Sequence, residues 1–195
     1  MVVTTKQRYT FEDWLAAPDD GHRYELLNGE LVEMAPPTAN HARLVSTLDR
    51  WLGRAQDAGF GTGLVGPVAV LLDAAMRREN APEPDALFVR RGREDIITDV
   101  AVEGVPDLVI EVLSPSNRDD DLPGGEKWKL YQRYGVPFYW TVDSSARLVA
   151  QHEHREGRLV EVARLRPGEE LRSPLFPGIT LPVAELFRNL REPAR

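Results

Sequence analysis

Two carboxylates in this sequence are placed where they could do chemistry together. Glu111 lies within the apolar run Leu-Val-Ile-Glu-Val-Leu, and Asp85 follows Pro84 at the start of another apolar segment. A charged carboxylate inside an apolar strand is unfavourable by several kcal/mol unless it pairs with a cation. Two carboxylates on neighbouring strands can share a hard cation such as Mg²⁺, which prefers oxygen ligands. Such a cation would convert one of its waters into a nucleophile.

Lys127 is the expected third member of this group. Its predicted helix carries three bulky side chains at spacings i+3, i+4 and i+7 from it, which are Leu130, Tyr131 and Tyr134. Residues at these spacings share a face, so we predict that the face is buried and that Lys127 points toward Glu111. Lys129, about 200° further around the helix, is predicted to face solvent. An inward ammonium can orient a water and stabilise negative charge that develops on a phosphate.

Each of these residues also has a simpler structural interpretation. A buried Glu111 can pair with a nearby Arg or Lys without any metal, and an Asp after Pro is a common residue at the start of a strand. The combination of two acids and a helical lysine, in this order, favours a joint site over separate structural roles.

Four helices are predicted from capping signals and apolar stripes. The first begins at Thr10, which has capping-box spacing to Asp13, and the second follows Asn40, a good N-cap residue. The second helix carries an apolar stripe at helical spacing, composed of Leu44, Val45, Leu48, Trp51, Leu52 and Ala55. The third helix runs from about 126 to 134, and Pro182 begins a short terminal helix.

Strands and one loop fill the intervals between these helices. Asn28-Gly29 is a strong two-residue hairpin signal and predicts strands at 24–27 and 30–34. Six further strands are predicted, at 64–73, 85–90, 107–113, 138–142, 148–154 and 159–165. The polar segment 114–125 is predicted to be a mobile loop. The resulting order has an αβββαβ centre, and the Glu111 strand is apolar on both faces, as in the middle of a mixed sheet.

Composition limits the class of protein. The 195 residues suit one core, so we expect a single domain over 1–195. Cysteine is absent, which excludes disulfides and thiolate metal sites. No apolar run reaches the length of about 20 residues that spans a bilayer, and charged residues near the start do not fit a signal peptide. We therefore expect a cytoplasmic protein that does not contact a membrane.

The formal net charge of -7 weighs against tight non-specific binding of DNA, because phosphate contacts normally come from Lys and Arg clusters. A local basic stripe can still bind phosphate on an acidic protein, and acidic metal ligands lower the net charge before a cation binds.

Several segments together resemble a known family. Pro84-Asp85, Glu111-Val112-Leu113 and Lys127 resemble the PD-(D/E)XK nuclease superfamily. Within it, the chain is similar to the Uma-type family of restriction endonucleases over about 11–186. The likeness is carried by the segments RYELLNGELVEMAPP, PEPDALFV, PDLVIEVLSPSNR, EKWKLYQRYGVPFYWTVD and LFPGITLPVAELF.

The resemblance implies a restriction-endonuclease-like fold of α/β (α+β) class, with a central mixed sheet flanked by helices. It also implies a metal held by Asp85, Glu111 and the backbone carbonyl of Val112. Leu113 stands where the superfamily pattern has its lysine, and Lys127 on the next helix matches that role instead.

Glu25 and His41 are further candidates for the site. Glu25 lies in the family-like hairpin segment as a possible extra ligand or base, and the alternative is a solvated hairpin edge shared with Glu30. His41 lies at the start of the second helix, where the superfamily often has another acidic residue. It is a candidate contact for phosphate or water, and the alternative is a second capping residue.

Other polar residues are given structural interpretations. His152 and His154 share a strand face, but nothing supplies the remaining ligands of a zinc site. The acidic run 119–121 is predicted to be a solvated loop tip, and Asp107 a structural residue at the start of its strand. Ser114 has no evident His-Asp relay.

We therefore expect an endonuclease that uses Mg²⁺ or Mn²⁺ to hydrolyse phosphodiester bonds, with DNA as substrate. Asp85 and Glu111 would hold the metal, and Lys127 would position the nucleophile. One domain has one such site, so cutting both strands would require a dimer or two encounters with the DNA, and we expect a homodimer. The main alternative is an inactive scaffold or interaction protein in which Glu111 and Lys127 form only a buried ion pair. A third is a hydrolase for another phosphate-containing substrate, with a closed pocket.

Overall fold

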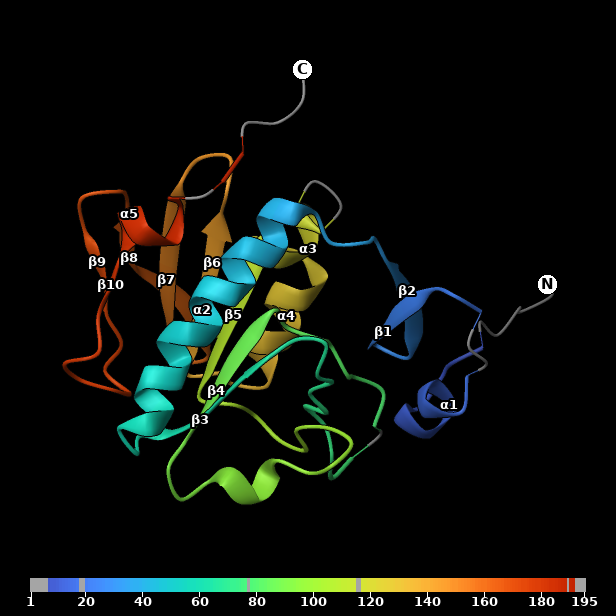
Figure 1. The fold of residues 1–195 in the computed structure, drawn as a ribbon. Coiled ribbons are helices and arrows are strands. Elements are labelled where there is room, and N and C mark those ends of the chain that lie inside the picture. Colours follow the sequence, from blue (N-terminus) through green and yellow to red (C-terminus); the bar gives the residue numbers. More distant parts are fainter. Residues whose placement is uncertain (1–6, 18–19, 77, 115–116, 189, 192–195) are drawn as a thin grey trace.

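A six-stranded mixed sheet forms the centre of the computed structural model, which describes residues 7–17, 20–76, 78–114, 117–188 and 190–191. Its strands follow the order β3–β4–β5–β6–β7–β8 (Figure 1). They are β3 (Gly61–Val65), β4 (Ala86–Arg90), β5 (Leu108–Leu113), β6 (Phe138–Asp143), β7 (Leu148–Arg155) and β8 (Arg158–Leu165). The β5–β6 pair is parallel and the other neighbouring pairs are antiparallel.

Helices cover both faces of this sheet. The long helix α2 (Ala39–Asp57) crosses one face, and α4 (Glu126–Arg133) lies on the other, behind the sheet in Figure 1. The predicted αβββαβ centre is confirmed as α2, β3, β4, β5, α4 and β6. Five of the six residues of the predicted α2 stripe are buried, namely Leu44, Leu48, Trp51, Leu52 and Ala55, and the sixth, Val45, is partly buried against the same core.

The two-sided apolar character of β5 follows from this layering. Ile110 packs in the core layer that contains α2, whereas Val109 packs in the layer that contains α4. Successive side chains of a strand point to opposite faces, so both layers require apolar residues from β5. Glu111 belongs by this alternation to the α4 face, and it is the one charged residue of the strand.

The N-terminal elements lie beside the sheet. The short helix α1 (Phe11–Leu15) begins with the predicted capping box between Thr10 and Asp13. Strands β1 (Arg23–Leu27) and β2 (Glu30–Met34) form the predicted hairpin, and both residues of the Asn28-Gly29 turn have positive φ. This backbone geometry is the one that a tight two-residue hairpin needs.

The remaining elements are short. Near the C-terminus, β9 (Glu170–Leu171) pairs with β10 (Leu181–Pro182), and α5 (Val183–Leu186) follows as the predicted terminal helix. A single 3₁₀ turn, η1 (Glu94–Ile96), follows β4. None of the helices in the described ranges is long and apolar enough to cross a membrane.

The predicted cap of α2 is wrong by two residues. Thr38 is the N-cap, and its hydroxyl accepts a hydrogen bond from the backbone of His41 at 3.2 Å. Asn40 instead pairs through its side-chain amide with the backbone of Arg191. Both residue types are good caps, so the sequence alone did not choose between them.

The predicted strand over 64–73 is also wrong. Strand β3 ends at Val65, and Gly66 makes the last bond of this edge, to the Asp85 carbonyl. Pro67 then has no N–H with which to continue the ladder. The apolar residues 68–72 pack on other parts of the protein, which explains why their pattern imitated a strand.

The predicted loop over 114–125 contains a helix. Residues 118–121 form α3 (Arg118–Asp121), while 115 and 116 lie outside the described residues. Gly125 allows α3 to approach α4, because a side chain there would collide with the backbone carbonyls of Asp119 and Asp120. The acidic run is therefore only partly a solvated tip, since Asp121 is completely buried.

Two glycines provide a matched test of how closely α2 packs on the sheet. A Cβ at Gly63 of β3 would lie 2.7 Å from the Leu52 Cβ, whereas a Cβ at Gly53 of α2 would meet nothing within 4 Å. We expect Gly63→Ala to lower the free energy of unfolding by about 1–3 kcal/mol. Gly53→Ala should raise it by about 0.5–1 kcal/mol. Urea denaturation of both variants measures these changes, and equal effects would contradict the packing described.

Candidate active site

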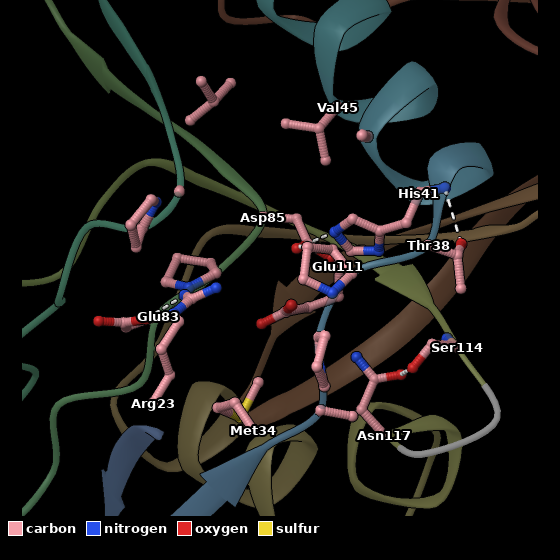
Figure 2. Close-up of a pocket in the computed structure, with 18 of the residues that line it drawn as sticks. Arg23, Met34, Thr38, His41, Val45, Glu83, Asp85, Glu111, Ser114 and Asn117 are labelled. Carbon is pink, nitrogen blue, oxygen red and sulfur yellow. Dashed lines mark hydrogen bonds and ion pairs between the residues drawn. The ribbon is translucent and has the colours of Figure 1, made fainter. Parts of the chain in front are cut away.

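A cavity of about 610 Å³ opens where β4 begins and β5 ends. Its walls come from the β2 end of the hairpin, the first turns of α2 and the segments around 66 and 84. Figure 2 shows Asp85, Glu111 and His41 converging on this hollow, with the Arg23–Glu83 ion pair on one side. The walls are largely apolar, with Met34, Val45, Val65, Pro67 and Pro84 among them.

The β4–β5 register brings Asp85 and Glu111 to the same place. Ala86 pairs with Ile110, so continuing the antiparallel register by one residue sets Asp85 opposite Glu111. Opposite residues of an antiparallel pair have Cβ atoms about 4.5–5.5 Å apart and share a face. Both acids line the cavity, as the joint interpretation of the sequence predicts.

Both oxygens of the Asp85 carboxylate have partners within the protein. Oδ2 accepts a hydrogen bond from the backbone N–H of Val112 at 2.7 Å. Oδ1 lies 2.9 Å from Nε2 of His41. The first contact fixes the carboxylate against β5, and the second connects it to the start of α2. The ring of His41 therefore contacts one of the two candidate metal ligands, a contact that the sequence did not predict.

Lys127 points inward, as predicted, and is almost completely buried. Its Nζ lies 2.8 Å from Oε1 of Glu111 and 3.0 Å from Oε1 of Glu25. The Oδ1 atom of a third acid, Asp121, lies 3.8 Å from the same Nζ. Burial acts to lower the pKa of Lys127, but the attraction of the three carboxylates outweighs it and raises that pKa well above its ordinary value. The ammonium therefore stays charged and can donate hydrogen bonds without acting as a base.

Glu25 is a member of the buried cluster and not a solvated hairpin edge. It is 1% exposed, and its Oε1 accepts hydrogen bonds from Lys127 and from the backbone N–H of Glu83. Glu30, at the other end of the turn, is exposed. The hairpin thus supplies one acid to the site, and the hydrogen bond of this acid with Lys127 connects β1 to α4.

Glu111 combines burial with two donors on one oxygen. Its Oε1 accepts the Tyr131 hydroxyl at 2.7 Å as well as the Lys127 ammonium. Burial raises the pKa of Glu111 well above its ordinary value, Lys127 opposes this, and the nearby acids Asp121 and Asp85 add to it. Burial also raises the pKa of Tyr131, with the Glu111 charge as the next cause.

Asp121 is the residue whose environment was predicted wrongly, because it is buried and not part of a solvated loop tip. Neither carboxylate oxygen has a hydrogen-bond partner among the residues that the structure describes. Burial raises the pKa of Asp121 to about 7, although Lys127 opposes this rise. The Tyr139 hydroxyl donates to the Asp121 backbone carbonyl at 2.8 Å and fixes the end of α3. The run of three Asp residues has no periodicity that would reveal which of them is buried.

The acids outnumber the cation in this cluster, which is the condition under which a divalent ion would be favourable. Glu25, Glu111 and Asp121 surround one ammonium, and Asp85 lies at the cavity edge. Within the described ranges no group of three or more His, Asp or Glu side chains is placed so that it could hold a metal ion. Mg²⁺ is usually held by only one or two carboxylates and keeps several waters, so the two acids that line the cavity, Asp85 and Glu111, fit the donor chemistry of such an ion.

The other residues singled out in the sequence have structural surroundings. His152 is buried against the Trp128 ring, and His154 contacts the Gln132 carbonyl at 3.1 Å. Asp107 accepts the Arg90 backbone N–H and pairs with Arg93 at 2.7 Å. Lys129 is exposed, as predicted, and pairs with Glu126. Tyr131 was expected only as a bulky residue of the buried face, and its hydroxyl is a polar contact that spacing alone does not indicate.

Among solved structures, one that is similar to this chain over most of its length shows the likeness of fold. It is a crystal structure described as "a putative nuclease belonging to DUF820" from Anabaena variabilis, with a TM-score of 0.72 and 14% identity. The match covers 92% of this chain and 97% of the other. At this identity the likeness concerns the fold, and it supports the restriction-endonuclease-like architecture predicted above. No curated protein matches this chain.

A family model described as "Putative restriction endonuclease" matches residues 10–184. This range includes all five side chains predicted for the site and the backbone position of Val112. Because the match extends over nearly the whole sequence, the chain belongs to this family, Uma2, whose description supports a function of nuclease type.

Proposed function

We propose that this protein is a metal-dependent endonuclease that hydrolyses phosphodiester bonds in DNA. The observation that carries the proposal is the buried Lys127, held between Glu25 and Glu111 beside a cavity that Asp85 also lines. Membership of a nuclease-type family supports the reaction class. The metal, the DNA substrate and the catalytic roles below are parts of the proposal.

Asp85 and Glu111 are the proposed ligands of Mg²⁺ or Mn²⁺, with the Val112 carbonyl as the third protein donor. When bound, the ion would supply a water of lowered pKa and neutralise charge on the phosphate. Asp85 is held in place by the Val112 N–H, so its carboxylate does not have to be ordered when a ligand arrives. His41 holds the other oxygen of Asp85 and faces the same cavity, where its ring can contact a water or a phosphate oxygen.

Lys127 is proposed to orient the attacking water and to stabilise the negative charge of the transition state. Its raised pKa keeps it a hydrogen-bond donor throughout. Glu25 is proposed to hold this ammonium at the cavity wall, because it accepts from Lys127 at 3.0 Å and is itself held by the backbone of Glu83. Charge stabilisation of this kind is strong because the groups are shielded from bulk water.

We also propose that the active form is a homodimer. A single site needs two encounters to cut both strands of a duplex, whereas a symmetric dimer supplies two sites with related geometry. Arg23 at the cavity mouth is half-exposed and is a candidate contact for the DNA backbone.

Substitution of the proposed ligands tests the reaction. We expect Asp85→Ala and Glu111→Gln to reduce metal-dependent cleavage of plasmid DNA to background, because each removes one of the two anionic donors. Lys127→Met should lower the initial rate by about 100-fold or more. The rates are measured with Mn²⁺ on supercoiled plasmid, after circular dichroism has shown that each variant is folded.

Lys129→Met is the matched control, because it removes the same charge from the same helix at an exposed position. It should cleave at the parental rate. If Asp85→Ala and Glu111→Gln also keep the parental rate, the proposed chemistry is wrong.

Calorimetric titration with Mn²⁺ separates the nuclease from the inactive scaffold. A nuclease of the proposed kind should give a saturable heat that disappears in Asp85→Ala. A scaffold in which Lys127 only neutralises Glu111 should give no site-specific heat in the parent protein. The titration requires no DNA, so it decides metal binding independently of the substrate.

A further inference from the structure

Asp121 is a buried acid that the proposed mechanism has not yet used. It is fully buried, and no described residue hydrogen-bonds to either carboxylate oxygen. An unsatisfied buried carboxylate destabilises a fold, and such groups in native proteins call for an explanation. The nearest cation is Lys127, whose ammonium lies 3.8 Å from Oδ1, beyond hydrogen-bond distance.

The contacts of Lys127 show how this distance could close. Its ammonium bonds Oε1 of Glu111 at 2.8 Å and Oε1 of Glu25 at 3.0 Å. A lysine has three N–H donors, and Asp121 is the third acid around the nitrogen. A movement of about 1 Å around the Glu25 contact would bring Asp121 to the usual length of a charge-assisted hydrogen bond.

A divalent ion at Asp85 and Glu111 would make this movement favourable. Glu111 Oε1 now neutralises the ammonium, and a second cation on the same carboxylate would repel Lys127 at close range. Glu25 does not bind this ion in the proposed site, so it can keep its contact with Lys127. Asp121 is held rigidly, because α3 packs on Gly125 and Tyr139 fixes its carbonyl.

We propose that Asp121 accepts a hydrogen bond from the Lys127 ammonium when a divalent cation binds Glu111 and displaces the ammonium from it. The inference rests on the proposed function and makes Asp121 a positioning residue, which touches neither metal nor substrate. Without Asp121 the displaced ammonium would lose its contact with Glu111 and gain no other acceptor. It would therefore compete more strongly with the ion for Glu111. Asp121 then has two effects, since it weakens the fold and strengthens metal binding.

The test is a double-mutant cycle on the affinity for Mn²⁺, measured by calorimetry on the full chain without DNA. Asp121→Asn should weaken Mn²⁺ binding by about 10-fold or more. In a Lys127→Gln background, where no ammonium competes for Glu111, the same substitution should change the affinity less than about twofold. Asp119→Asn removes the same charge from an exposed position of α3 and should leave the affinity unchanged.

Each outcome decides the inference. An Asp121→Asn protein with parental affinity overturns it while leaving the proposed function intact. An equal loss in the Lys127→Gln background also overturns it, because Asp121 would then act on the ion directly or through its charge alone. A parent that binds no Mn²⁺ overturns the proposed function and this inference together.

Thermal unfolding keeps the test decisive if Lys127→Gln does not fold. Asp121→Asn should melt at or above the parental temperature, because it removes a buried carboxyl group to which no described residue donates a hydrogen bond. A melting temperature lower by more than about 4 °C would mark a purely structural role and overturn the inference. The inference is supported if Asp121→Asn has parental stability and weakened Mn²⁺ binding, while Asp119→Asn keeps the parental affinity.

Discussion

The ammonium of Lys127 is the interaction on which the arrangement of the site depends. It joins β1, β5 and α4 through Glu25 and Glu111, which lie far apart in the sequence. Because the cluster is buried, each partner left alone would be an uncompensated charge. This one side chain therefore connects the hairpin, the central strand and the helix, which also pack together in one apolar layer. The apolar layers on both faces of the sheet provide the dry surroundings that make these contacts strong.

The same cluster explains why a site for a cation is plausible on an acidic protein. Three buried acids share one ammonium, and burial raises the pKa values of Glu111 and Asp121. The charge of this region can thus be balanced by protons or by a metal ion. The acidic net charge of the sequence weighs against DNA binding. Part of that charge, however, comes from the acidic residues that would hold the ion.

Much of the site was predictable because its signals are local. The apolar run around Glu111, the helical spacing of Lys127 and the Asn28-Gly29 turn each identify an element and a face. The environments of Glu25 and Asp121 were not predictable in this way, because they depend on how the hairpin and α3 pack on the rest of the chain. The segment 66–73 misled for a related reason, since its apolar residues fill a neighbouring core without joining the sheet.

The close packing of α2 on β3 has a mechanical consequence. The helix has 19 residues and is about 28 Å long. Leu52, in its second half, meets the backbone of Gly63, while His41 in its first turn holds Asp85. A helix behaves as a stiff rod over this length, so a tilt produced at Leu52 would displace the imidazole at the opposite end. The missing side chain at Gly63 of this edge strand thereby influences the position of the His41 imidazole, which lies several helical turns away.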